Sequence, residues 1–222
     1  MFDLDGTILD SIDAWWQAFN DGVAVFQLEP VPKERLMAFM NGGARLSEIL
    51  VGFYPELGVD ASAALIGEIM EEIRKRYPTN SGTRVDLAIG ALELLSRLKQ
   101  RGLKIGVVTS RSMMAEKQWR ELEELKVAHL VDCVVTASDS RRKPAPDTVI
   151  ECLECLNTQP EECIIVGDSL ADILAGKAAG VRTVAVTSGV ADLPTLAAES
   201  PDFIFDSLPS LLSRLDSVLG EY

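Results

Sequence analysis

The chain has 222 residues, of which 47% are hydrophobic and 25% charged, so it holds enough apolar material for a core with a smaller insert. Its 34 acidic and 21 basic residues give a net charge of −13, which disfavours binding to nucleic acid or an anionic membrane. The sequence shows no signal peptide and no apolar run of about 18 residues, so we expect a cytoplasmic protein that does not span a membrane.

The chain opens on an acidic segment, Asp3–Thr7, with the sequence DLDGT. We expect Met1 and Phe2 to be the end of a strand that leads into this segment. Strands usually run for about 5–6 residues, and only these two residues precede Asp3. We therefore expect either a shortened first strand or a start that lies further upstream.

Residues 12–80 contain no strand-like run as strong as those found later in the chain. Proline- and glycine-rich turns divide this segment into amphipathic stretches. These patterns predict helices at Ala14–Phe26, Lys33–Met40, Leu46–Phe53 and Ala61–Tyr77. We predict an all-helical cap at 12–80, inserted after the first strand of a core formed by 1–11 and 81–222. Its hinges are expected near Leu9–Ile12 and Pro78–Arg84.

The second half of the chain alternates apolar runs with helical patterns. Most of the apolar runs are continuous, which is typical of a parallel sheet covered on both faces. Strands are predicted at Lys104–Thr109, Asp132–Thr136, Cys163–Gly167, Val181–Val186 and Phe203–Phe205. Helices are predicted at Ile89–Arg101, Ser112–Leu125, Asp147–Leu156 and Leu170–Ala179. This alternation predicts an α/β fold with a doubly wound, parallel, Rossmann-like core sheet.

Two details of this half allow specific predictions. Ile89, Leu92, Leu95 and Leu98 are spaced like the buried face of one helix. Cys152 and Cys155 form a C-x-x-C pair, but a second ligand pair and a turn between the two are missing. We therefore expect ordinary core cysteines rather than a metal or redox site.

Four motifs follow one another in the chain: Asp3–Thr7, Val107–Arg111 (VVTSR), Lys143–Asp147 (KPAPD) and Val166–Asp172 (VGDSLAD). In this order they resemble the haloacid dehalogenase-like superfamily of phosphotransferases, and the resemblance covers nearly the whole chain. The helical segment after the first motif is similar to the subgroup of phosphoglycolate phosphatases, bacterial pyrophosphatases and β-phosphoglucomutases. The resemblance implies an enzyme that acts on a small phosphorylated metabolite.

The predicted sheet gives the motifs a common location. Asp3, Thr109 and Asp168 each follow a predicted strand, and parallel strands present their carboxyl ends to one crevice. Several carboxylates in one crevice are costly unless a cation neutralises them. Mg²⁺ suits such oxygen ligands. The expected ligands are the carboxylates of Asp3 and Asp168 and the backbone carbonyl of Asp5.

The resemblance also implies roles for the acidic segment. Asp3 would be the nucleophile that forms an aspartyl-phosphate. Asp5 would protonate the leaving alcohol and then deprotonate the hydrolytic water. Gly6 would relieve the tight turn and let backbone N–H groups approach the phosphate.

The later motifs would complete the site. The Thr109 hydroxyl and the Ser110 N–H would hold phosphoryl oxygens, and Lys143 would offset the charge of the phosphoryl group and Asp3. Ser169 would support the metal site. Asp172 would orient Lys143 or support the metal, or would merely be an acid favoured in the first turn of a helix.

Several alternatives remain open from sequence. Arg45, in the turn Asn41–Arg45, would bind a second anionic group of the substrate or would be a surface residue at a helix start. A sugar phosphomutase would use the same core motifs. A dehalogenase of this fold is disfavoured, because Asp5, Lys143 and Asp168 are all present. The single histidine, His129, lies outside every motif and is assigned no chemistry.

Overall fold

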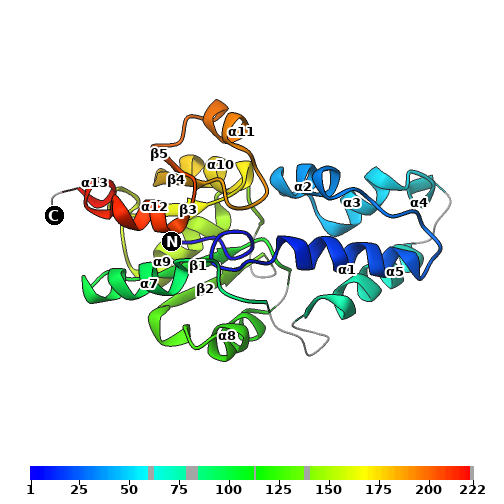
Figure 1. Cartoon of the computed structure of the whole chain (residues 1–222), viewed down its shortest axis with the longest axis horizontal. Helices are drawn as coiled ribbons and strands as arrows, with labels where there is room; N and C mark the ends of the chain where they lie inside the picture. Colours follow the sequence, from blue (N-terminus) through cyan, green and yellow to red (C-terminus); the bar gives the residue numbers. More distant parts are fainter. Residues whose placement is uncertain (60–62, 79–84, 113, 138–140, 221–222) are drawn as a thin grey trace.

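The structure is a computed structural model that describes residues 1–59, 63–78, 85–112, 114–137 and 141–220. A core with a parallel sheet and a group of helices lie side by side (Figure 1). Most of the second predicted hinge, residues 79–84, falls outside the described residues, as does the predicted boundary at 80/81. The division into cap and core at these positions therefore stays a prediction.

The core sheet contains only parallel strand pairs among the described residues. Its strands are β1 (Gly106–Thr109), β2 (Cys133–Thr136), β3 (Ile164–Gly167), β4 (Arg182–Val186) and β5 (Phe203–Phe205). Strand β1 pairs with β2, and β4 lies between β3 and β5. Phe2 makes parallel bridges to Val107 and Val166, so the start of the chain lies between β1 and β3. The predicted parallel α/β core is confirmed.

Helices cover both faces of this sheet. The core helices are α7 (Ala91–Gln100), α8 (Ala115–Glu124), α9 (Asp147–Leu156), α10 (Leu170–Ala178), α11 (Leu193–Ala198), α12 (Leu208–Ser213) and α13 (Leu215–Leu219). Short 3-10 turns follow α8 at Ala128–Leu130 and α9 at Pro160–Glu162. The short elements α11 to α13 were not predicted from sequence.

Successive strand residues alternate between two hydrophobic clusters. Val107 and Val166 pack with residues of α7, α8, α12 and α13 on one face. Val108 and Ile165 pack with residues of α9 and α10 on the other. Since both faces are buried, the strands carry continuous apolar sequences, as the parallel-sheet prediction assumed.

The predicted buried face of the helix at Ile89–Arg101 is partly wrong. The helix begins only at Ala91, after Gly90, whose φ of +84° is left-handed. Its buried residues are Ala91, Leu94, Leu95 and Leu98, a stripe with helical spacing. Ile89 precedes the helix and is 86% exposed, and Leu92 is 51% exposed.

The cap consists of helices with their own apolar cluster, which lie to the right of the core in Figure 1. Its helices are α1 (Ile12–Ala24), α2 (Lys33–Asn41), α3 (Leu46–Phe53), α4 (Glu56–Val59) and α5 (Ala63–Arg76). Helices α1 and α5 pack closely at Gly22, where an added Cβ would lie 2.8 Å from the Cα of Ile73. Glycine is therefore needed for this helix contact.

One turn of the cap lies directly against the core. The Asn41 side chain accepts a hydrogen bond of 2.7 Å from the N–H of Leu170, the first residue of α10. Gly43 has a φ of +75°, and an added Cβ would lie only 2.4 Å from the carbonyl oxygen of Lys143. The turn between α2 and α3 thus contacts the core through backbone atoms at a position that only glycine can occupy.

The structure corrects the prediction for one cysteine. Cys155 is exposed on α9 and forms a disulfide with the buried Cys133 of β2. Cys152 is free and buried, as predicted, and Cys163 is also free and buried. Disulfides are rare in cytosolic proteins. The cysteines therefore no longer support the predicted cytoplasmic location, which stays a prediction.

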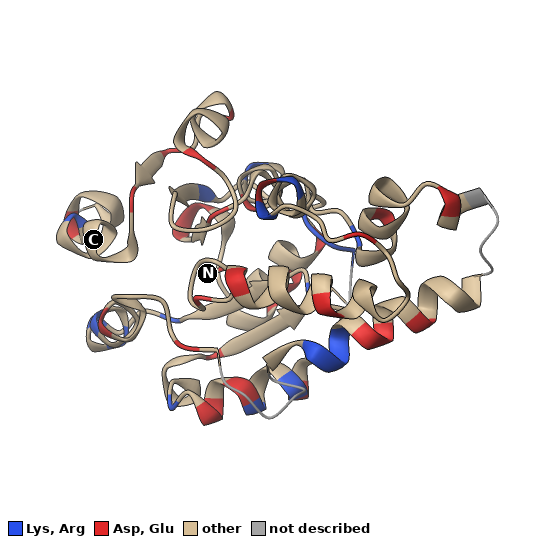
Figure 2. Ribbon diagram, turned by 45° about the vertical axis from the view of Figure 1, so that its right-hand side comes forward, with Lys and Arg blue, Asp and Glu red and all other residues tan. Residues whose placement is uncertain are grey.

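Acidic residues are distributed along helices of both the cap and the core (Figure 2). Among the described residues, no helix combines the length and the apolar character that crossing a membrane requires.

Candidate active site

Asp3 lies at the edge of the sheet where the neighbouring strands β1 and β3 end, and a tight loop follows it. Its backbone N–H donates to the carbonyl of Val166, while Gly6 donates to the carbonyl of Leu9 and closes the turn. Gly6 has a φ of +79°, and an added Cβ would lie 2.5 Å from Oδ2 of Asp168. Glycine is required here for both the backbone conformation and the close approach of Asp168.

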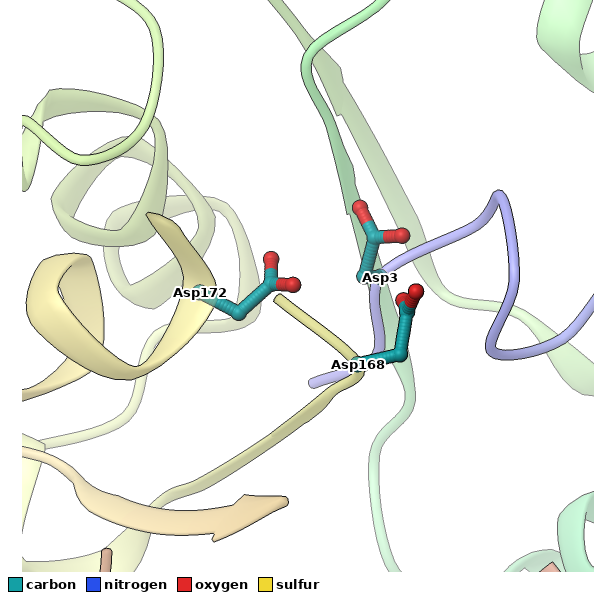
Figure 3. A group of neighbouring side chains, drawn as sticks. All are labelled: Asp3, Asp168 and Asp172. Carbon is teal, nitrogen blue, oxygen red and sulfur yellow. The ribbon is translucent and has the colours of Figure 1, made fainter. Parts of the chain in front are cut away.

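Three buried carboxylates meet beside this loop. Asp3 comes from the start of the chain, Asp168 from the end of β3 and Asp172 from α10, and their side chains extend toward a common point (Figure 3). One oxygen of each lies within 4.8 Å of the others. The structure thus brings the two predicted carboxylate ligands together and adds Asp172 to them.

Lys143 connects two of these carboxylates. Its Nζ donates to Oδ1 of Asp3 and to Oδ1 of Asp172, each at 2.5 Å, and to the carbonyl of Val108 at 2.8 Å. The residue is only 1% exposed. Burial lowers the pKa of Lys143, but Asp172 and Asp3 outweigh that effect, so its pKa is raised and the ammonium stays charged.

Asp172 contacts Lys143 and also lies in the first turn of α10. Oδ1 accepts from Lys143, as noted, and Oδ2 accepts from the N–H of Ser169 at 3.1 Å and from its hydroxyl at 2.5 Å. The Ser169 hydroxyl in turn accepts from the N–H of Asp172. The pair therefore forms a capping box at the start of α10 while Asp172 also orients the buried lysine.

Asp168 is held by groups on two loops. Oδ1 accepts from the Thr7 hydroxyl at 2.8 Å, and Oδ2 accepts from the N–H of Val190 at 2.8 Å. A Cβ at Gly189 would lie 1.8 Å from Oδ2 of Asp168, so only glycine lets that loop approach. Thr7 and Gly189 were not predicted as site residues, because the DLDGT sequence alone does not reveal a partner in the fourth motif.

The combined negative charge of Asp3, Asp168 and Asp172 exceeds the single positive charge of Lys143. Burial, with the nearby charge of Asp172, raises the pKa of Asp168 to about 7, although the Val190 N–H and Thr7 oppose this. Burial likewise raises the pKa of Asp3 well above its usual range despite Lys143. Oxygen donors in such a group fit a hard divalent cation such as Mg²⁺, which would relieve the repulsion.

Thr109 and Ser110 follow β1 at the same edge of the sheet. Thr109 is 1% exposed, and its hydroxyl accepts from the N–H of Arg111 at 3.2 Å. The carbonyl of Ser110 accepts from Arg142. Both Thr109 and Ser110 line the same cavity as Asp3, Asp168 and Lys143.

Asp5 is bound by Arg111, a residue whose role sequence reasoning missed. Nε of Arg111 donates to Oδ2 of Asp5 at 2.7 Å, and its NH2 donates to Oδ1 at 2.6 Å. Ser11 and Trp15 also donate to Oδ1, at 2.7 and 3.0 Å. Burial raises the pKa of Asp5, but Arg111, Ser11 and Trp15 together lower it below its usual value.

The cavity above these residues has a volume of about 490 Å³ and reaches from the core to the cap. Trp15, Met40 and Met70 contribute an apolar wall. Arg45 is exposed at the start of α3 and also lines the cavity, as does Arg142 of the core. Burial lowers the pKa of Arg142, and the like charge of Arg45 lowers it further, so the two guanidinium groups act on one another.

Comparison with known proteins places the chain among hydrolases. The sequence profile of the family described as "Haloacid dehalogenase-like hydrolase" matches residues 1–186. A pyrophosphatase PpaX of Anoxybacillus flavithermus is 29% identical over 216 residues, covering 97% of this chain and 95% of the relative. A phosphoglycolate phosphatase of Aquifex aeolicus is 29% identical over 225 residues, covering 100% and 98%.

Solved structures share the fold. The crystal structure of a predicted phosphoglycolate phosphatase from Haemophilus somnus superposes with a TM-score of 0.83 and 22% identity. The match covers 96% of each chain. The helical segment and the α/β core of the present chain therefore both have counterparts in that fold.

Proposed function

Since the chain belongs to the haloacid dehalogenase-like hydrolase family, we propose that it is a Mg²⁺-dependent phosphatase that hydrolyses small phosphorylated metabolites through an aspartyl-phosphate on Asp3. The observation that carries the proposal is the buried group in which Lys143 bridges Asp3 and Asp172, with Asp168 alongside. Such a group combines a nucleophile, a fixed cation and oxygen donors for a metal in one cavity.

In the first step, a carboxylate oxygen of Asp3 attacks phosphorus, and the bond from phosphorus to the leaving oxygen breaks. Asp5 enters this step protonated, although Arg111, Ser11 and Trp15 lower its pKa in the substrate-free protein, and it gives that proton to the leaving oxygen. Lys143 donates a hydrogen bond to Asp3, and its positive charge offsets the negative charge of the phosphoryl group. Thr109 and Ser110 supply donors for the phosphoryl oxygens.

In the second step, water attacks phosphorus and gives a proton to Asp5, and the bond between phosphorus and Asp3 breaks. Inorganic phosphate leaves, and Asp3 is again a carboxylate. Asp5 thus acts as a general acid in the first half-reaction and as a general base in the second, which restores its starting protonation state.

The carboxylates of Asp3 and Asp168 and the backbone carbonyl of Asp5 would hold Mg²⁺. The cation would neutralise these acids and the phosphoryl oxygens. Ser169 and Asp172 would support this arrangement through the capping box and through Lys143. The raised pKa of Asp168 supports the proposal. It reflects buried negative charges that repel one another, and a bound cation would offset them.

The substrate class is a small phosphate, and the names of the relatives suggest phosphoglycolate or pyrophosphate as first candidates. Both carry a second anionic group besides the phosphoryl group that is transferred. Arg45 of the cap and Arg142 of the core are suited to bind that group, because two like charges that repel one another gain from a shared anion.

The test is phosphate release from phosphoglycolate, pyrophosphate and hexose phosphates, with Mg²⁺ and with chelator. We expect Mg²⁺-dependent release with a preference for one small bis-anionic substrate. Bisphosphate-dependent isomerisation of a hexose phosphate with little release would instead favour a phosphomutase. Release that is unaffected by chelation would contradict the proposed metal dependence.

A further inference from the structure

The strongest polar network outside the nucleophile group surrounds Arg111. This residue is 7% exposed, and its guanidinium contacts Asp5 through two nitrogens in the fork geometry that suits a carboxylate. Asp5 lines the cavity, and its side chain retains 14% exposure. Both carboxylate oxygens of Asp5 therefore have a fixed partner on the core.

Arg111 is fixed from the opposite side by α8. NH1 donates to Oε2 of Glu121 at 2.5 Å and to Oε1 of Gln118 at 3.2 Å. Neither of these residues lines the cavity described above. Because Glu121 keeps the guanidinium paired, one oxygen of Asp5 can turn from Arg111 toward a leaving group while the other oxygen stays on Arg111. The buried arginine is then never left unpaired, which would be strongly destabilising.

The same network reaches both chain connections between core and cap. Ser11, at the first connection, donates to Asp5, and so does Trp15 on α1. Tyr77, directly after α5, accepts from NH2 of Arg111 at 2.7 Å. Its ring stacks on Trp15 with centroids 4.2 Å apart, and Arg111 lies 5.0 Å from the Tyr77 centroid. The position of Asp5 is therefore tied to the cap.

We infer that Arg111 is a positioning residue: anchored on Glu121, it orients Asp5 for proton transfer and links that orientation to Ser11, Trp15 and Tyr77 at the base of the cap. This inference rests on the proposed role of Asp5 as the acid that protonates the leaving oxygen. It assigns no contact between Arg111 and the phosphoryl group.

The test compares two phosphates of similar shape. Phenol is a poorer leaving group than p-nitrophenol, so phenyl phosphate needs the acid more than p-nitrophenyl phosphate does. With Mg²⁺ present, kcat/KM reports the steps up to departure of the phenol. Arg111→Met should lower kcat/KM for phenyl phosphate on the order of 10- to 100-fold, and for p-nitrophenyl phosphate by a clearly smaller factor.

Further variants separate positioning from general damage. In Asp5→Asn, addition of Arg111→Met should cause little further loss on phenyl phosphate, because the two residues act as one unit. Arg111→Lys keeps the positive charge but cannot bind both Asp5 oxygens through two nitrogens. It should therefore be more active than Arg111→Met and less active than the wild type. Tyr77→Phe removes the hydroxyl that accepts from Arg111 and also donates to Oδ1 of Asp5 at 3.4 Å, so it should show the same leaving-group pattern more weakly.

Equal losses on both phosphates, or losses that multiply in the double variant, would overturn the inference. Arg101→Met serves as the matched control, because it removes a surface ion pair with Asp216 outside the cavity and should leave both rates unchanged. If Arg111→Met fails to fold, Arg111→Lys decides the question with the same two phosphates, because it should lose more activity on phenyl phosphate than on p-nitrophenyl phosphate. If the wild-type chain hydrolyses neither phosphate, that result would instead contradict the proposed phosphatase function itself.

Discussion

At the scale of single residues, the site depends on charges that are buried together. Lys143 lies between Asp3 and Asp172, yet the pKa of Asp3 remains raised, because burial and the neighbouring acids outweigh the lysine. A carboxylate kept in such surroundings costs stability, which is common where function rather than folding dictates a residue. Activity and stability should therefore respond in opposite directions when one of these charges is removed.

Asp3→Asn tests this expectation. The variant lacks the nucleophile, so phosphate release should fall by at least about 10³-fold, in the range seen when a catalytic group is deleted. The loss of one buried like charge should leave the melting temperature of the metal-free protein unchanged or raise it.

Kinetics and thermal melting of the same preparation check both expectations. Asp216→Asn, on a side chain that is 87% exposed, is the control for a change of one surface charge. Retained turnover in Asp3→Asn would contradict the assignment of Asp3 as the nucleophile.

The nucleophile group could be predicted for two different reasons. Asp3 and Asp168 follow predicted strands, which places them at the sheet edge, whereas Lys143 was assigned from the family resemblance of its motif. Arg111 was missed as the partner of Asp5, although it stands in a recognised motif. The two residues are 106 positions apart, and no local spacing encodes such a contact.

At the scale of elements, the turn between α2 and α3 determines how closely the cap meets the core. Gly43 lies against the carbonyl of Lys143, and Asn41 caps the first N–H of α10. These contacts come from the segment that the sequence analysis identified only as the turn that holds Arg45. Its docking on the core could not be predicted, because it depends on the relative placement of α2 and α10.

Gly43→Ala should separate this turn from the core. The new Cβ would have to lie 2.4 Å from a carbonyl oxygen at a φ of +75°, so the turn must shift. Displacements of about 1 Å near a site can cost on the order of 100-fold in rate, and we expect a loss of kcat/KM of roughly 10- to 100-fold.

Gly42→Ala is the matched control. Gly42 has a φ of −79°, and the nearest atom to an added Cβ is 3.8 Å away, so this alanine should be tolerated. Steady-state kinetics of the two variants on one phosphate check the difference. Equal activity of both would show that the close contact at Gly43 has no role in turnover.

Helix α7 shows how an element can be predicted while its orientation is not. The apolar residues at Ile89 and Leu92 suggested a buried face, but the helix starts two residues later than Ile89. That shift follows from the left-handed conformation of Gly90, which packs against Pro209. The packing partner lies in a different part of the sequence, so the helix start could not be obtained from periodicity alone.

At the scale of the whole molecule, stability should depend on pH through the carboxylate group. Asp168 has a pKa of about 7 in the folded metal-free protein, against 3.8 ordinarily. Between these values the folded state holds a proton that the unfolded state has lost. The free energy of unfolding should therefore fall as pH rises from about 4 to about 7, and Asp3, whose pKa is also raised, should contribute in the same direction.

Mg²⁺ should reverse this loss, and more strongly at pH 8 than at pH 5, because protons no longer compete for the carboxylates. At 100 times its dissociation constant a ligand adds about 2.7 kcal/mol, or about 5–10 °C in melting temperature for a chain of this size. Thermal melts from pH 5 to pH 8, with Mg²⁺ or chelator, measure both effects. Asp168→Asn should flatten the metal-free pH slope; an unchanged slope would contradict the assignment.

The disulfide between Cys133 and Cys155 has a topological consequence. It closes a covalent ring between β2 and α9, across 22 positions of sequence, and Lys143 lies inside that ring. A single cut by a protease within the ring would leave both new ends joined to the fold through sulfur. Cleaved protein should migrate as one chain on a denaturing gel until a thiol is added, so the segment with the buried lysine would stay attached even after its backbone is broken.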